Sequence, residues 1–139
     1  MLNTSNIRTE LYNLVISTAA FSESNTDLTR YAGDSISSSD LPRAVIEFDN
    51  ATVEYESIGS PRSVRIESSF MIHVYTSSES SMDAFMNQIL NAIDDRTLNG
   101  QVQELMVTDI DYQFSSEADA DYGRGTITIT TQTSSTIND

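Results

Sequence analysis

The chain has 139 residues, a length typical of one domain with a core of its own. It carries 21 acidic residues against seven arginines, for a formal net charge of −14, and it contains no lysine and no cysteine. This balance disfavours binding to nucleic-acid phosphates, and the missing residue types exclude thiol and Schiff-base catalysis. No apolar run reaches the roughly 18 residues that a membrane-spanning helix needs.

The acidic excess has three interpretations, which the sequence leaves open. A strongly charged surface favours solubility. It also suits a salt-rich environment, because at 1 M salt the Debye length falls to about 3 Å and mutual repulsion is screened. Third, an acidic surface repels phosphates, so DNA could slide past it without binding.

The first predicted element is an amphipathic helix near the N-terminus. Its apolar stripe has helical spacing and consists of Ile7, Leu11, Leu14, Val15 and Thr18. Ser5 or Asn6 is placed to cap the helix, and we expect it to end near Ala20. Phe21 should then fold back onto the core.

Residues 22–40 form a polar stretch rich in serine and threonine. Nearly twenty residues without a periodic pattern are unusual inside a compact domain. We therefore expect a long surface arm, which Leu28, Tyr31 and Ile36 could pin to the body of the protein.

Two short extended runs follow, at residues 44–48 and 51–56, and their apolar residues have opposite parity. A one-residue slip reverses the faces of a strand, so the change of parity predicts a turn or bulge near Asp49 and Asn50. Turn-forming residues at 58–62 predict a hairpin between residues 51–57 and 64–75.

A second helix is predicted after residue 80, where Ser80 can act as the cap with Asp83 three residues later. Its broad apolar face consists of Met82, Phe85, Met86, Ile89, Leu90 and Ile93. Asn99 and Gly100 are the residues expected to close it.

The last third of the chain predicts a second hairpin. Residues 102–114 read as a long strand with a bulge, because their apolar residues change parity. Residues 124–131 alternate isoleucine with threonine, and residues 134–139 read as a frayed tail. The predicted fold is a single α+β domain: a mixed or antiparallel sheet of two hairpins, packed by the central helix, with an additional N-terminal helix.

Catalytic and metal-binding patterns are nearly absent from the sequence. His73 is the single histidine and lies in mid-strand, which favours a structural role. Glu117, Asp119 and Asp121 match the first acids of a calcium loop, but Tyr122 replaces its glycine and Thr128 its final glutamate. The sequence therefore predicts no catalytic residue, no cofactor and no metal site, and it does not indicate an enzyme.

Three segments carry a resemblance to a known family. Residues 69–77 form a strand that leads into a helix, and residues 121–129 form a turn and a closing strand. Between them, the helix has apolar spacing at Phe85, Ile89, Leu90 and Ile93. The layout over roughly residues 5–133 resembles the tail terminator, or tail completion, proteins of long-tailed phages and archaeal tailed viruses. The resemblance rests on the order and length of elements, because no invariant chemical motif is involved.

The resemblance implies a structural protein of the virion, located in the tail or neck and assembled in the host cytoplasm. Such a protein forms a ring, expected to have six copies, that caps the tail tube, ends its polymerisation and provides the docking face for the head connector. The implied partners are further copies of the chain, the tail tube protein and a head-completion or connector protein. DNA would pass through the lumen without specific binding, and no membrane is involved.

Two loops are the candidate contacts with the ring, tube or neck, and each could equally be a solvated loop. Their residues are Gly59, Ser60, Pro61, Arg62, Glu117, Asp119, Asp121, Tyr122 and Arg124. Two other functions remain open: another neck or head-completion subunit, and a small non-viral α+β binding or adaptor domain.

Overall fold

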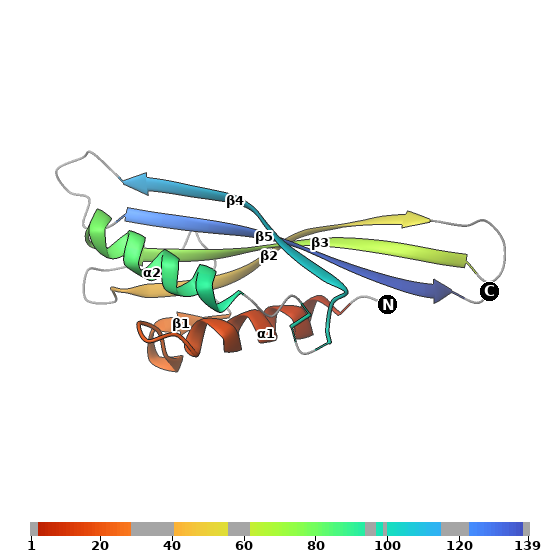
Figure 1. The fold of residues 1–139 in the computed structure, drawn as a ribbon, viewed down its shortest axis with the longest axis horizontal. Coiled ribbons are helices and arrows are strands. Elements are labelled where there is room, and N and C mark those ends of the chain that lie inside the picture. Colours follow the sequence, from red (N-terminus) through yellow and green to blue (C-terminus); the bar gives the residue numbers. More distant parts are fainter. Residues whose placement is uncertain are drawn as a thin grey trace.

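A computed structural model describes residues 3–28, 41–55, 62–93, 97–98, 100–114 and 123–137. Its elements in chain order are α1 (Thr4–Ile16), the short 3-10 helix η1 (Glu23–Asn25), β1 (Thr26–Asp27), β2 (Arg43–Tyr55), β3 (Arg62–Thr76), α2 (Glu79–Ala92), β4 (Glu104–Phe114) and β5 (Gly123–Ile137). The two α-helices lie on one face of a twisted sheet (Figure 1). The α+β class predicted from the sequence is confirmed.

The described strands form one five-stranded sheet in the order β1-β2-β3-β5-β4. β2 with β3 and β4 with β5 are the two predicted antiparallel hairpins, and β3 pairs antiparallel with β5 to join them. β1 pairs with β2 in parallel, so the sheet is mixed. The four long strands thus alternate in direction across the sheet.

β2 is one continuous strand, although the sequence predicts two short runs. Its pairing with β3 extends from Arg43 opposite Tyr75 to Tyr55 opposite Val64 and shifts once, between Phe48 and Asn50. The predicted irregularity near Asp49 is therefore a bulge within the strand and not a turn. A similar shift between Val107 and Asp109 confirms the bulge predicted in β4.

β5 is longer than the sequence indicates. It continues to Ile137, and residues 134–137 pair with residues 62–65 of β3 where a frayed tail is predicted. Serine and threonine in this stretch provide no hydrophobic alternation from which a strand could be recognised. Backbone pairing with β3 extends the strand without such a signal.

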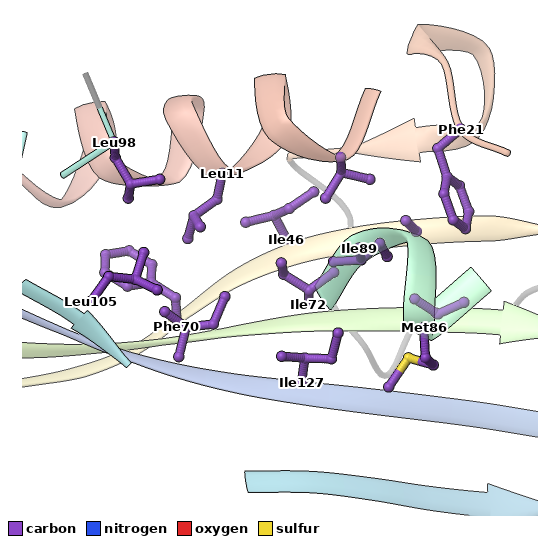
Figure 2. Packing of buried hydrophobic residues seen from close by; sticks show 14 of the residues in the cluster. Leu11, Phe21, Ile46, Phe70, Ile72, Met86, Ile89, Leu98, Leu105 and Ile127 are labelled. Atoms are coloured by element: carbon purple, nitrogen blue, oxygen red, sulfur yellow. The ribbon is translucent and has the colours of Figure 1, made fainter. Parts of the chain in front are cut away.

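The core lies between the two helices and the central strands (Figure 2). α1 packs mainly on β1 and β2, and α2 packs on β3 and β5. The largest side chains with almost no exposed surface are Phe70, Ile7, Leu11, Ile46, Ile72, Met82, Met86, Ile89, Ile127 and Ile129. The apolar faces predicted for both helices therefore point inward, and Phe21 also folds back, edge-on to Phe85 with ring centroids 5.6 Å apart.

The helix ends differ from those predicted. α1 begins at Thr4, after Asn3, and ends at Ile16, four residues before Ala20. The cap of α2 is Ser78, because its backbone is extended and its side chain accepts the hydrogen bond from the Ser81 backbone N–H. α2 ends at Ala92, well before Gly100, which lies in a later turn at φ +85°.

The start of the predicted arm packs against the sheet. Thr26 and Asp27 form β1 beside Ala44 and Val45, and the Asp27 carboxylate binds the Arg43 guanidinium at 2.8 Å. Leu28 packs against the core, as the sequence predicts. Tyr31 and Ile36 lie outside the described residues.

Gly125 gives a test of the packing between α2 and β5. A Cβ atom added there would lie 2.6 Å from Met82 Sδ and 3.1 Å from Met86 Sδ. We expect Gly125→Ala to lower the free energy of unfolding in urea by about 1–3 kcal/mol, as overpacked cores do. In a Met82→Ala background the loss should shrink, since the sulfur atom is gone. An equal loss in both backgrounds would contradict the crowding explanation.

Candidate functional site

The structure describes the side chain of only one of the nine candidate contact residues, Arg124. Arg62 begins β3 opposite Ile137, and its backbone alone is described. The others lie outside the described residues: Gly59, Ser60, Pro61, Glu117, Asp119, Asp121 and Tyr122. Contacts through these two loops therefore stay predictions.

Arg124 lies on the face of the sheet opposite the helices. It pairs with Tyr75 on β3 and with Gln113 on β4, and its guanidinium Nη2 donates a hydrogen bond to Gln113 Oε1 at 2.8 Å. The side chain is half-buried. Arg124 thus joins two strands and is part of the sheet surface.

A buried polar cluster lies on the same face, across three neighbouring strands. His73 is 4% exposed; its Nε2 lies 3.0 Å from Glu47 Oε2 and its Nδ1 lies 3.0 Å from Thr126 Oγ1. Burial lowers the pKa of His73, the hydrogen bond and charge of Glu47 oppose this, and the positive charge of Arg124 adds to the lowering. The net direction is downward, which favours a neutral imidazole.

The order hydroxyl, imidazole, carboxylate is that of a hydrolytic triad. However, these three residues lie within the paired parts of β2, β3 and β5. Thr126 lies between His73 and Asp111 in the strand ladder, so the backbone N–H groups next to its hydroxyl in the described chain are positioned by strand pairing and do not form an oxyanion hole. The cluster therefore satisfies a buried histidine and ties the strands together.

One depression of about 440 Å³ opens beside the start of α1. It is lined by neutral residues: Asn3, Gly100, Gln101, Val102, Gln103, Thr133 and Ser134. These lining residues include no acidic or basic side chain. Across the described part of the chain, no three His, Asp or Glu side chains are grouped to hold a metal ion, and no helix is long and apolar enough to cross a membrane.

The most distinctive surface features are apolar side chains on two strands. Exposed large hydrophobic residues occur in the described chain only on β2 and β4: Phe48, Val53, Tyr55, Met106, Val107, Ile110 and Tyr112. On β2 they follow the point where β1 stops pairing, since β1 reaches only Ala44 and Val45. There the ends of β2, β3 and β5 extend beyond the two helices (Figure 1).

The second apolar surface lies along β4, which pairs only with β5 among the described strands. Val107, Ile110 and Tyr112 lie opposite Ile129, Ile127 and Gly125, so they are on the side of the sheet that carries the helices. The Tyr112 side chain is hydrogen-bonded to Asp83 of α2. Burial, together with this hydrogen bond and the charge of Asp83, raises the pKa of Tyr112. Neither helix has its main contact with β4, which leaves the apolar row exposed.

Sequence reasoning did not identify either apolar surface. The alternation of Ile110 with Asp109 and Asp111 indicates a strand with one apolar side, but not that the strand is an edge. That depends on the strand order, which places β4 outside β5.

Together, the fold and its surfaces define a small α+β protein whose exposed features are strand edges. No model of a known protein family matches the chain, and no curated protein does. A solved chain from a structure described as "Virion of native gene transfer agent (GTA) particle" has a similar fold, with a TM-score of 0.63 at 13% identity. The alignment covers 95% of this chain and 97% of that one. A second solved chain, at 16% identity over 94% of this chain and 96% of its own, has a lower TM-score of 0.46.

The lowered pKa of His73 predicts a pH dependence of stability. In the unfolded chain the pKa of histidine is about 6.5. Below that pH the unfolded state binds a proton that the folded state resists. The contribution of His73 to the free energy of unfolding is therefore fully present above a pH of about 6.5 and is lost as the pH decreases. Glu47→Gln removes the charge that opposes this lowering, and we expect a steeper loss between pH 7.5 and 5 in urea unfolding. His73→Asn should flatten the curve relative to the unmodified chain; equal slopes for all three proteins would contradict the assignment.

Proposed function

We propose that the protein is a structural subunit of a virion, without enzymatic activity, that forms a ring at the end of a tail tube. The ring would cap the tube, stop its polymerisation and provide the docking face for the head connector. Its neighbours would be further copies of the chain, the tube protein and the connector protein. Six copies are the expected number, by resemblance to tail terminator proteins.

The observation that carries the proposal is the fold shared with a chain of a gene transfer agent virion over nearly the whole length of both chains. At 13% identity this likeness is one of fold, so the surfaces provide the second support. A subunit between a tube and a connector must contact more than one neighbour. The described chain has two separate apolar surfaces, one at the far end of β2 and one along β4.

Cyclic assembly follows from contacts between two different surfaces of the same chain, since such heterologous contacts close into a ring when the rotation per subunit is right. The extension of β2, β3 and β5 beyond the helices can reach a neighbouring copy. It carries Val53 and Tyr55, which are 44% and 61% exposed. Apolar area of this kind favours association when it is removed from water.

The net charge of −14 is compatible with a ring through which DNA passes. Carboxylates around a lumen would repel phosphates, whereas a basic lumen would retain the DNA. Assembly into a ring would bring acidic groups of neighbouring copies close together. Assembly should therefore become more favourable as salt screens their repulsion.

Ring formation can be tested by measuring the mass of the purified chain in solution and by imaging it in the electron microscope. We expect a closed ring of about six copies whose formation increases with salt. Val53→Thr keeps a β-branched residue but removes apolar surface, so it should weaken the ring, whereas Asp49→Asn on the same strand should not. A monomer at every salt concentration, including molar salt, would refute the ring.

The capping activity requires a separate assay with polymerising tail tubes. Added protein should halt elongation and bind one end of each tube. Unchanged tube length and unchanged ends would leave no terminator role, and binding at the connector instead would identify another neck subunit.

The salt-rich interpretation of the acidic surface makes its own prediction. If mutual repulsion of carboxylates limits stability, the melting temperature of the chain should rise between low and molar salt as the repulsion is screened. Glu104→Gln removes one exposed carboxylate from β4 and should reduce this rise slightly. Equal melting temperatures at low and molar salt would exclude adaptation to high salt.

A further inference from the structure

Among the described strands, β4 is at the edge of the sheet, and it has two chemically different sides. Its helix side carries the apolar row Val107, Ile110 and Tyr112. The opposite side carries Asp109 and Asp111, which lie across from Thr128 and Thr126. The outer backbone edge, which no described strand covers, therefore runs between an apolar row and an acidic row.

The acidic row has no cationic partner among the described residues. Glu104, Asp109 and Asp111 are all exposed, and none of them makes an ion pair or a side-chain hydrogen bond in the described part of the chain. The nearest described cation on this face, Arg124, is bonded to Gln113. Carboxylates that have no partner among the described residues, beside the outer edge of the described sheet, are available for a cation supplied from outside.

We propose that the outer edge of β4 binds an extended segment of a different protein in which apolar and basic residues alternate. The segment would add to the sheet as a further strand, with backbone hydrogen bonds to β4. Because directly opposite residues lie on the same face, its apolar residues would cover Ile110 and Tyr112. Its basic residues would lie opposite Asp109 and Asp111 on the other face.

A second copy of the chain is a poor occupant of this edge. Pairing β4 with another β4 would place carboxylates opposite carboxylates, which destabilises a strand pair. The far end of β2 alternates apolar with acidic residues, since Glu54 lies between Val53 and Tyr55. A described run with the required alternation, Val64-Arg65-Ile66, belongs to β3, which is already paired on both sides.

The bulge between Val107 and Asp109 determines where the added strand can lie. Regular pairing of β4 with β5 resumes at Asp109 and continues to Phe114. The regular part of the outer edge is therefore residues 109–114, and Ile110 is the most exposed apolar residue among its described side chains, at 46%. This proposal does not depend on ring formation, because a monomer presents the same edge.

The test uses a fluorescent ten-residue peptide of alternating valine and arginine, with binding to the full chain measured by anisotropy. Three control peptides separate the contributions: valine with glutamate, serine with arginine, and valine with arginine carrying an N-methyl group on every backbone amide. We expect saturable binding of the first peptide alone, weakened by salt. N-methylation prevents strand pairing without changing charge, so equal binding of the methylated peptide would overturn the proposal.

Variants of the chain locate the binding site. Asp109→Asn with Asp111→Asn removes the acidic row, and about fivefold to tenfold weaker binding is expected from the loss of two cross-strand charge pairs. Ile110→Thr should also weaken binding, while the control Asp49→Asn, on β2, should not. Unchanged binding by both β4 variants would refute the site. Self-association of the unmodified chain that Ile110→Thr abolishes would show instead that the edge binds a second copy.

Discussion

The whole structure depends on the double pairing of β3. This strand is paired with β2 from Tyr75 to Val64 and with β5 from Arg62 to Thr76, so both of its edges are used along almost their full length. Because the two hairpins meet at β3, their apolar residues line up on one face. Phe70 and Ile72 then lie in the core, on the face of the sheet that carries the helices (Figure 2). Of the other described strands, only β5 also has a long neighbour on each side.

The strands are longer than the area that the helices cover, and this determines where the protein can make contacts. α2 covers β3 and β5, whereas α1 covers the start of β2. Residues 49–55 of β2 are all exposed, as are residues 106–113 of β4. Because the helices cover only the middle of the sheet, apolar side chains on the described parts of β2 and β4 at its margins stay exposed. Neighbouring molecules can bury these side chains, which is why we place function at the margins.

The sequence predicted the parts of the fold that depend on apolar periodicity. Both helices, both hairpins and the bulge in β4 were recognised, because apolar residues such as Ile72 and Ile127 recur with the period of their element. The irregularity near Asp49 was also located, but the sequence left open whether it is a turn or a bulge. The helix caps and the length of β5 were not recognised, since several serines compete for the cap of α2 and residues 134–137 have no apolar pattern. The apolar edges were missed for a further reason: exposure of Ile110 depends on the strand order and not on its own sequence neighbours. The predicted contact loops remain untested, because Arg124 alone has a described side chain.

The acidic composition and the exposed apolar edge of β4 become consistent when they are considered together. An edge strand with free backbone groups and apolar side chains would ordinarily promote aggregation. Asp109 and Asp111 on the opposite side oppose pairing with any equally acidic chain, and every copy of this protein is acidic. The same carboxylates attract a basic strand, so one set of charges disfavours self-pairing and favours a foreign partner. A chain with 21 acidic residues and no lysine can therefore keep an apolar edge exposed until a partner of opposite charge covers it.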